Sequence, residues 1–246
     1  MKAIITFHSI DPSGSVLSYP PDLFADLLVA LHESGIPIVG LHQLLDDDVE
    51  RAVTITFDDG MKSVYTNALP VLRDFDVPAH LFLTTGPIGK PGTWPDENGI
   101  EPNFQMLGWA EIEKLHAAGV SIEGHTDAHP DMRTLSETQM SDQCEHADRR
   151  IEERLGRRPE FFAYPFGYHN AAARDYARNH YTASVTTELG ILEASYDTAA
   201  IPRLDSYYLR SRWLMRDIQS AQARMYFRLR SMLRNLRGSQ CPADAP

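Results

Sequence analysis

The sequence is poor in cysteine and has no long hydrophobic run. Its two cysteines, Cys144 and Cys241, lie far apart and form no CxxC pair, so a structural disulfide is not expected. No apolar stretch approaches the roughly 20 residues that a membrane-spanning helix needs. The first residues show neither the apolar core nor the cleavage site of a secretory signal. Together these absences predict a cytoplasmic protein in a reducing compartment.

Positive charge is scarce outside the C-terminal region. Residues 203–237 contain nine arginines and two aspartates, a balance of +7, although the whole chain has a formal net charge of −11. The remaining 14 basic and 32 acidic residues balance to −18. This charge argues against nucleic-acid binding by the main body of the protein.

Short apolar runs alternate with helical patterns along most of the chain. Seven runs predict strands, at residues 2–8, 36–39, 52–58, 79–85, 120–124, 161–165 and 182–187. Helix signals lie between them, as after Pro21, from Trp109 and after Ser136. A chain of 246 residues with 43% hydrophobic content suits one large core. The alternation predicts an α/β fold, a single-domain distorted (β/α)7-type barrel over residues 1–205.

Two polar motifs follow predicted strands, at the end where barrel enzymes carry their active sites. Asp58 ends the run at 52–58 and Asp59 follows it, and His125 and His129 follow another run with a spacing of four. Each motif has an ordinary alternative, since an Asp-Asp-Gly sequence can form a turn and paired histidines occur by chance. Together they predict a site of two histidines and one carboxylate, which leaves positions open for water and substrate.

Three motifs in order carry a resemblance to a known family. TFDDG at 56–60, HTDAH at 125–129 and YPFG at 164–167 resemble the motifs of the NodB-homology polysaccharide deacetylases, also called carbohydrate esterase family four. The resemblance covers roughly residues 2–205, and the early histidine is closest to the subgroup of poly-N-acetylglucosamine de-N-acetylases. It implies hydrolysis of N-acetyl groups on a sugar, in a glycan, a glycolipid or a polysaccharide precursor.

The resemblance also implies roles for single residues. Asp59, His125 and His129 are expected to hold one divalent metal ion, with Zn2+ favoured and Co2+, Ni2+, Fe2+ or Mn2+ compatible. Asp58 is expected to act as the base that deprotonates a metal-bound water, the nucleophile. The main-chain N–H of Phe166 is expected to stabilise the oxyanion.

Two residues of the family pattern are missing at their usual positions, so other residues are expected to take their roles. The third motif has Ala163 where many members have an arginine that orients the base, and Arg203 is the candidate substitute, although it could equally be an ordinary surface arginine. No histidine follows His180, so the usual late general acid is missing. His8 resembles the early histidine of the poly-N-acetylglucosamine subgroup and is predicted to protonate the leaving amine, the alternative being a buried structural histidine.

Substrate contacts are predicted around the mouth of the barrel. Trp94 lies in an irregular loop at 86–108 and can either stack on a sugar ring or anchor the loop, as can Phe104. The remaining expected substrate-binding residues, Tyr164, Pro165 and His169, lie in or just after the YPFG motif.

The C-terminal region predicts a basic helical extension over residues 206–237, with a disordered tail at 238–246. Apolar residues recur there at spacings of four and three, which places them on one face of a single helix. They are Leu214, Ile218, Ala221, Met225, Leu229, Met232 and Leu236. Such a helix can lie on an anionic membrane, at its inner face beside lipid-linked sugars, or pack against the barrel or a twin subunit.

Other functions remain open at this stage. The same hydrolytic chemistry serves a related enzyme of esters or of non-sugar C–N bonds. A carbohydrate-binding barrel without catalysis and an adaptor that uses the basic helix are further alternatives. The residues give no indication of an oligomeric state.

Overall fold

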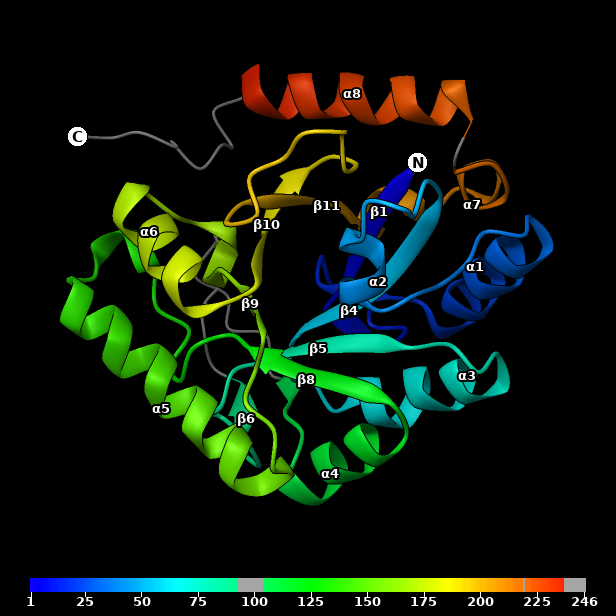
Figure 1. Ribbon diagram of the computed structural model, residues 1–246. Helices are drawn as coiled ribbons and strands as arrows, with labels where there is room; N and C mark the ends of the chain where they lie inside the picture. The colour runs from blue at the N-terminus through cyan, green and yellow to red at the C-terminus, as the bar shows by residue number, and fades with distance from the viewer. Residues whose placement is uncertain (93–103, 219, 237–246) are drawn as a thin grey trace.

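Seven parallel strands close into one barrel with helices on its outside (Figure 1). The computed structural model describes residues 1–92, 104–218 and 220–236. The barrel strands are β1 (Lys2–Phe7), β4 (Ala52–Asp59), β5 (Ala79–Leu83), β8 (Val120–Gly124), β9 (Phe161–Ala163), β10 (Ala183–Leu189) and β11 (Ile201–Asp205). β1 pairs with β4 on one side and with β11 on the other, so the strand order closes on itself. The predicted seven-stranded α/β barrel is therefore confirmed.

One predicted barrel strand was wrong. Residues 36–39 form only an isolated bridge, between Ile38 and Val53, and the seventh strand is instead β11. β4 pairs with β1 along its length and with β5 from Ile55 onwards, so residues 36–39 reach only the start of one edge of β4. β11 was missed because Pro202 and Arg203 interrupt its apolar pattern.

Helices connect the barrel strands and cover the outside. They are α1 (Pro21–Glu33), α2 (Leu41–Leu45), α3 (Leu69–Asp74), α4 (Trp109–Ala117), α5 (Glu137–Leu155) and α6 (Ala171–His180). A π-helical turn spans Val64–Ala68, and 3₁₀ turns span Met132–Thr134, Pro165–Gly167 and Ser206–Leu209. Two small sheets pair β2 (Ser9–Ile10) with β3 (Ser18–Tyr19), and β6 (Pro91–Gly92) with β7 (Phe104–Gln105). The helices predicted after Pro21, Trp109 and Ser136 are confirmed as α1, α4 and α5.

Strand β4 shows how the core positions polar groups. All eight of its residues are buried, as expected for a strand covered on both faces. The ring of Phe57 packs against Phe7 and Phe24, with centroids 5.7 and 5.9 Å away. Because side chains alternate along a strand, Thr56 and Asp58 lie on the opposite face from Phe57. Apolar packing on one face therefore fixes the direction of the polar side chains on the other.

The C-terminal region forms two helices rather than the single predicted one. α7 (Arg212–Arg216) and α8 (Ala221–Leu236) are separated at residues 217–220. The Ser220 hydroxyl accepts a hydrogen bond from Ala223 N at 3.0 Å, which starts a new helix there. α8 lies along one side of the barrel, outside the other elements (Figure 1).

The break divides the predicted apolar face between two directions. Leu214 and Ile218 are buried, whereas Met225, Leu229 and Met232 are exposed. α8 instead turns Ala223 and Phe227 toward the body. The predicted tail at 238–246 lies outside the described residues.

Candidate active site

The predicted metal ligands meet at the carboxyl end of the barrel. Strand register places Asp59 beside Leu83, Leu83 beside Gly124, and Gly124 beside Phe162, so β4, β5, β8 and β9 end at one level. His125 directly follows Gly124 and therefore reaches the mouth next to Asp59. Parallel pairing thus brings together groups that are 66 residues apart in the chain.

Asp59, His125 and His129 form a compact and buried group of possible metal ligands. Asp59 Oδ1 lies 3.3 Å from His125 Nε2 and 3.4 Å from His129 Nε2. One ligand atom from each residue lies within 4.8 Å of the others. His125 Nδ1 lies 2.7 Å from the Ala163 carbonyl oxygen, which requires a proton on Nδ1 and leaves Nε2 of the neutral imidazole as an acceptor. Two acceptors then face each other, an arrangement that fits a cation between them.

The pKa shifts of Asp59 and His129 favour the charge states of metal ligands, whereas the shift of His125 favours its protonated form. Burial opposes ionisation of Asp59, but hydrogen bonds from His125 and His129 outweigh burial and hold the pKa of the carboxyl well below its usual range. Burial lowers the pKa of His129, which favours the neutral, ligating imidazole. Burial also disfavours charge on His125, yet the hydrogen bond to Asp59 prevails and raises its pKa. A bound cation would take the place of that proton.

Backbone strain is concentrated at this site. Asp59, His129 and Phe166 have φ angles of 71°, 56° and 59°, in the left-handed region that favours glycine. Such a conformation costs about 1–3 kcal/mol for a non-glycine residue and persists only where the surroundings fix it. At His129, the backbone N–H donates to Thr126 Oγ1 at 3.1 Å. These backbone conformations direct Asp59, His129 and Phe166 toward the same site.

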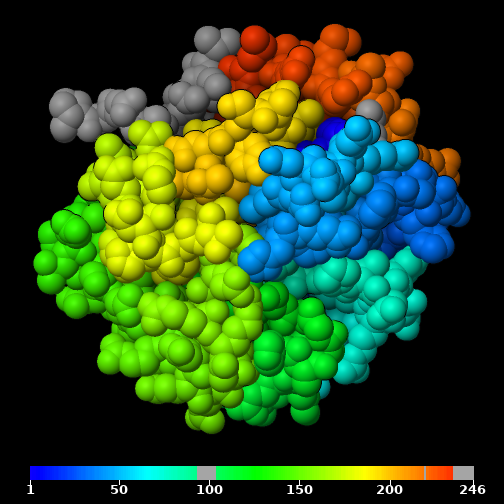
Figure 2. Space-filling model, viewed as in Figure 1, coloured from blue at the N-terminus to red at the C-terminus, as the bar shows by residue number. Residues whose placement is uncertain are grey.

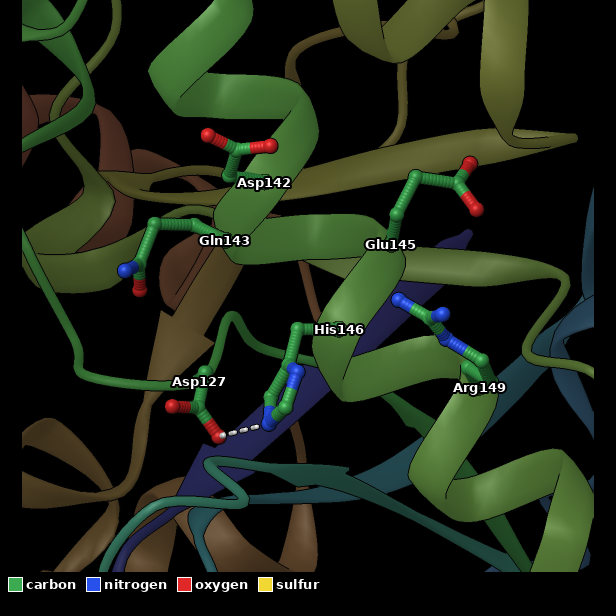
Figure 3. A pocket seen from close by; sticks show the side chains of 6 residues that line it. All are labelled: Asp127, Asp142, Gln143, Glu145, His146 and Arg149. Carbon is green, nitrogen blue, oxygen red and sulfur yellow. Dashed lines mark ion pairs between the residues drawn. The ribbon is translucent and has the colours of Figure 1, made fainter.

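Helix α5 supports the loop that carries the histidines. The Asp127 N–H donates to the Gln143 carbonyl at 3.2 Å, and Ala128 N donates to Gln143 Oε1 at 2.9 Å. Arg150 donates to Asp127 Oδ1 at 3.0 Å. Figure 3 shows the adjoining surface hollow of about 360 Å³, where His146 Nε2 lies 3.9 Å from Asp127 Oδ1. Asp127 and Gln143, which line this hollow, therefore also belong to the hydrogen bonds that hold the loop.

Asp58 is held by a buried arginine. Arg203 Nη1 donates to Asp58 Oδ1 at 2.8 Å, and Nη2 donates to Oδ2 at 2.6 Å. Arg203 Nε donates to the Thr186 carbonyl at 2.8 Å, which fixes the orientation of the guanidinium plane. Arg203 is only 1% exposed, so it is not an ordinary surface arginine. The pairing predicted between Arg203 and Asp58 is confirmed.

His8 lies beside the same carboxylate. It follows β1, which pairs with β4, and its Nε2 is 4.0 Å from Asp58 Oδ2. Its side chain is 23% exposed, so it can be reached from solvent, unlike the buried Asp58. His8, Asp58 and the three possible metal ligands therefore converge on one mouth.

The YPFG motif exposes the ring of Phe166 and buries the side chains around it. Phe166 is 41% exposed, and its ring lies 4.5 Å from that of His129. Tyr164, Pro165 and His169 are buried, and the Tyr164 hydroxyl donates to the Ala199 carbonyl at 2.7 Å. These three side chains pack around the turn, and their contact with substrate stays a prediction.

Glycine is needed within this turn. Gly167 has a φ of 73°, and a Cβ there would collide with Thr187. Thr187 Oγ1 also donates to the Phe166 carbonyl at 3.1 Å. Trp94, the remaining predicted substrate contact, lies outside the described residues.

Several supporting residues were not predicted. Thr56 Oγ1 accepts from Arg203 at 3.3 Å, and Thr6 Oγ1 lies 3.5 Å from Asp58 Oδ2. Both threonines are buried in barrel strands. A polar residue two positions before Asp58 is a signal that Thr56 shares its face, but threonine is so common in strands that the signal is weak.

Comparison with known proteins identifies the family. The family model for polysaccharide deacetylase matches residues 46–184. The chain belongs to the polysaccharide deacetylase family. YxkH of Bacillus subtilis, named for the same family, is 26% identical over 208 residues, covering 82% of this deacetylase and 70% of YxkH. Members hydrolyse N-acetyl groups, so the predicted enzyme class is confirmed.

Other relatives cover less of the sequence or show the fold alone. The poly-β-1,6-N-acetyl-D-glucosamine N-deacetylase of Staphylococcus aureus is 29% identical over 133 residues, which cover 49% of this deacetylase and 42% of that protein. IcaB from Ammonifex degensii superposes with a TM-score of 0.73 at 22% identity, covering 87% and 97% of the two chains. The Streptococcus pyogenes deacetylase PplD gives 0.71 at 24% identity, covering 82% and 91%.

Proposed function

We propose that this deacetylase removes acetyl groups from an N-acetylated sugar with the help of one divalent metal ion. The observation that carries the proposal is the convergence of the paired Asp58 and Arg203 with the Asp59, His125 and His129 group. A binding protein would not need a buried carboxylate that is held ionised beside a set of metal ligands. Both the base and the ligands are retained in this chain.

Asp58 is proposed to accept the proton of the attacking water. Burial raises the pKa of its carboxyl, but the charge and hydrogen bonds of Arg203 outweigh burial and leave the pKa below its usual value. Asp58 is therefore ionised near neutral pH and available as a base. Arg203 acts as a positioning residue, because it fixes both carboxylate oxygens.

A divalent ion, when bound, polarises the acetamide carbonyl and makes water more acidic. Asp59, His125 and His129 would hold it, and two nitrogens with one oxygen suit zinc, with cobalt, nickel, iron or manganese as alternatives. The chain's own groups complete the chemistry. His8 is proposed to give a proton to the leaving amine, and the Phe166 N–H to stabilise charge on the carbonyl oxygen.

The substrate is proposed to be longer than one sugar. A hollow of about 450 Å³ is lined by Ser9, which follows His8, and by Met61 and Lys62, which follow the Asp58–Gly60 turn. Phe104 forms part of its wall and offers a ring on which a sugar can stack. Such a hollow beside the mouth suits a neighbouring sugar of a glycan or glycolipid.

Acetate release tests the proposal. Oligomers of β-1,6-linked N-acetylglucosamine are the first substrate, followed by a bacterial glycolipid extract, with metal-stripped, zinc-loaded and cobalt-loaded protein compared. Release should require metal, and Asp58→Asn should lower it by about 10²–10⁴-fold, as for loss of a general base. Release from an ester or a non-sugar amide alone would indicate the related hydrolase. Metal-dependent sugar binding without release would indicate a carbohydrate-binding barrel.

A further inference from the structure

Exposed apolar side chains gather in the C-terminal region. Nine large hydrophobic residues among those described are exposed, and six of them lie within residues 207–233. These six are Tyr207, Trp213, Met225, Leu229, Met232 and Leu233. α7 and α8 form an orange to red band at the surface of the molecule (Figure 2). Such a concentration marks an interaction surface rather than scattered surface residues.

The outward face of α8 is a defined apolar stripe. Met225, Leu229, Met232 and Leu233 follow one another at spacings of four, three and one, and they are 68%, 55%, 64% and 39% exposed. The spacing places them along one side of the helix. Phe227, which is 2% exposed, anchors the opposite side to the body. The helix is therefore held to the barrel by the side that carries Phe227, and the stripe residues do not pack in the core.

The stripe is bordered by positive charge. α8 contains four arginines and no acidic residue. Arg224 and Arg228 each precede a stripe residue and lie along one flank of it, and Arg228 also lies 3.0 Å from Glu193. On the inner side, Arg230 lies over the Tyr208 ring at 5.1 Å. This combination of an apolar stripe and a basic flank is typical of helices that lie in a membrane interface.

We propose that the outward face of α8 docks on an anionic lipid bilayer. Its charge complements acidic headgroups, while the Met and Leu side chains enter the boundary of the acyl chains. A second copy of the protein fits less well. Two-fold pairing through the outward face would bring Arg224 and Arg228 of each copy together, four arginines without an acidic residue in either helix. No helix in the described part of the chain is long and apolar enough to cross a membrane.

Docking would also orient the mouth of the barrel. Arg234 of α8 donates to the Thr187 carbonyl at 3.1 Å, and Thr187 donates to the Phe166 carbonyl. The helix is therefore attached through one residue to the turn beside His129. A glycolipid at the membrane surface would be the substrate class that this arrangement favours, and only that last step rests on the proposed function.

Vesicle co-sedimentation tests the docking directly, in the absence of substrate. The full chain is mixed with vesicles of phosphatidylglycerol and phosphatidylcholine, and with pure phosphatidylcholine, at 0.15 M salt. We expect binding to the mixed vesicles only. The triple variant Met225→Gln, Leu229→Gln, Met232→Gln should bind at least tenfold more weakly, and Arg224→Gln about fivefold more weakly, as for one basic residue near the surface.

A matched control separates the stripe from general apolar exposure. The double variant Val16→Gln, Val29→Gln removes two exposed valines elsewhere and should bind as the parent does. Circular dichroism and the melting temperature check that each variant is folded. Equal binding of parent and triple variant would overturn the proposal. So would a dimer in light scattering that the triple variant dissolves, because the stripe would then serve a second copy.

Discussion

The mouth of the barrel buries charge, whereas α8 exposes apolar surface. Asp58, Asp59 and Arg203 are each at most 3% exposed, while Met225 and Met232 are 68% and 64% exposed. Each arrangement is unfavourable for folding by itself, through desolvation of ions in the first case and hydration of hydrocarbon in the second. Sites that depart from the rules of stability in this way are where function is expected. The mouth buries charged groups, which indicates chemistry there, and α8 exposes apolar groups, which indicates association with a partner.

Breaking the buried ion pair should have the largest effect. Arg203→Met leaves the Asp58 carboxylate buried without its partner, so the free energy of unfolding should fall by about 3–5 kcal/mol. Urea unfolding measures this loss. Adding Asp58→Asn should recover most of the stability, because the stranded charge is then removed. If Arg203→Met alone unfolds at the parent's urea midpoint, the pair is not what holds this region together.

Removing the proposed proton donor should affect turnover and leave metal binding unchanged. His8→Gln should lower the rate of acetate release by about 100-fold, the lower range for general acid catalysis. The measurement is turnover at saturating metal together with the metal content of the protein. His42→Gln is the control, since His42 lies outside the mouth and pairs with Glu160 at 2.9 Å. Similar rates for both variants would remove His8 from the mechanism.

The two sides of α8 should respond differently to truncation. Phe227→Ala empties a buried position and should destabilise the protein by about 3–5 kcal/mol. Met232→Ala trims the exposed stripe and should change stability by no more than about 0.5 kcal/mol. Thermal unfolding of the two variants compares them. Equal losses would show that the outward face also contributes to folding.

Asp148 is another buried carboxyl, but its pKa shifts in the opposite direction from that of Asp58. Burial raises the pKa of Asp148 to about 7, since Arg158 approaches only to 3.5 Å and Tyr181 gives one hydrogen bond. A folded-state pKa above the unfolded value of about 3.9 means that the contribution of Asp148 to stability is most favourable at low pH and declines as pH rises to about 7.

Asp148→Asn should therefore flatten this pH dependence. The parent is expected to lose about 1–3 kcal/mol of stability between pH 5 and pH 8 through this group, and the variant should not. Urea midpoints at the two pH values test the difference. Parallel pH profiles for parent and variant would contradict the role given to Asp148.

Most residues at the mouth could be predicted from the sequence, because the strand that a residue ends fixes where it lies in the barrel. Once Asp59 and His125 are placed at the ends of parallel strands, pairing in register brings them together without further information. The Arg203 pairing also followed, since its place near the end of the barrel pattern suggested a partner for Asp58. β11 itself did not, because its proline and arginine conceal a strand that is recognised only from its neighbours.

The orientation of α8 was not predictable from periodicity. Spacing shows which residues share a face, but the direction of that face depends on how the helix enters. Ser220 starts α8 afresh, so the apolar residues on the two sides of the break point in different directions. Likewise, Tyr164 and His169 lie in or just after a motif of the mouth, and periodicity gave no sign that tertiary packing buries their side chains.

Closure of the barrel through β1 and β11 has a consequence for synthesis of the protein. β1 leaves the ribosome first, yet its Ile5 and Thr6 gain their neighbours Leu204 and Asp205 only when the last strand has been made. Until then β1 and β10 present open edges that can pair with other chains. The growing chain therefore keeps an open sheet, which is prone to aggregation, until β11 emerges and closes the barrel.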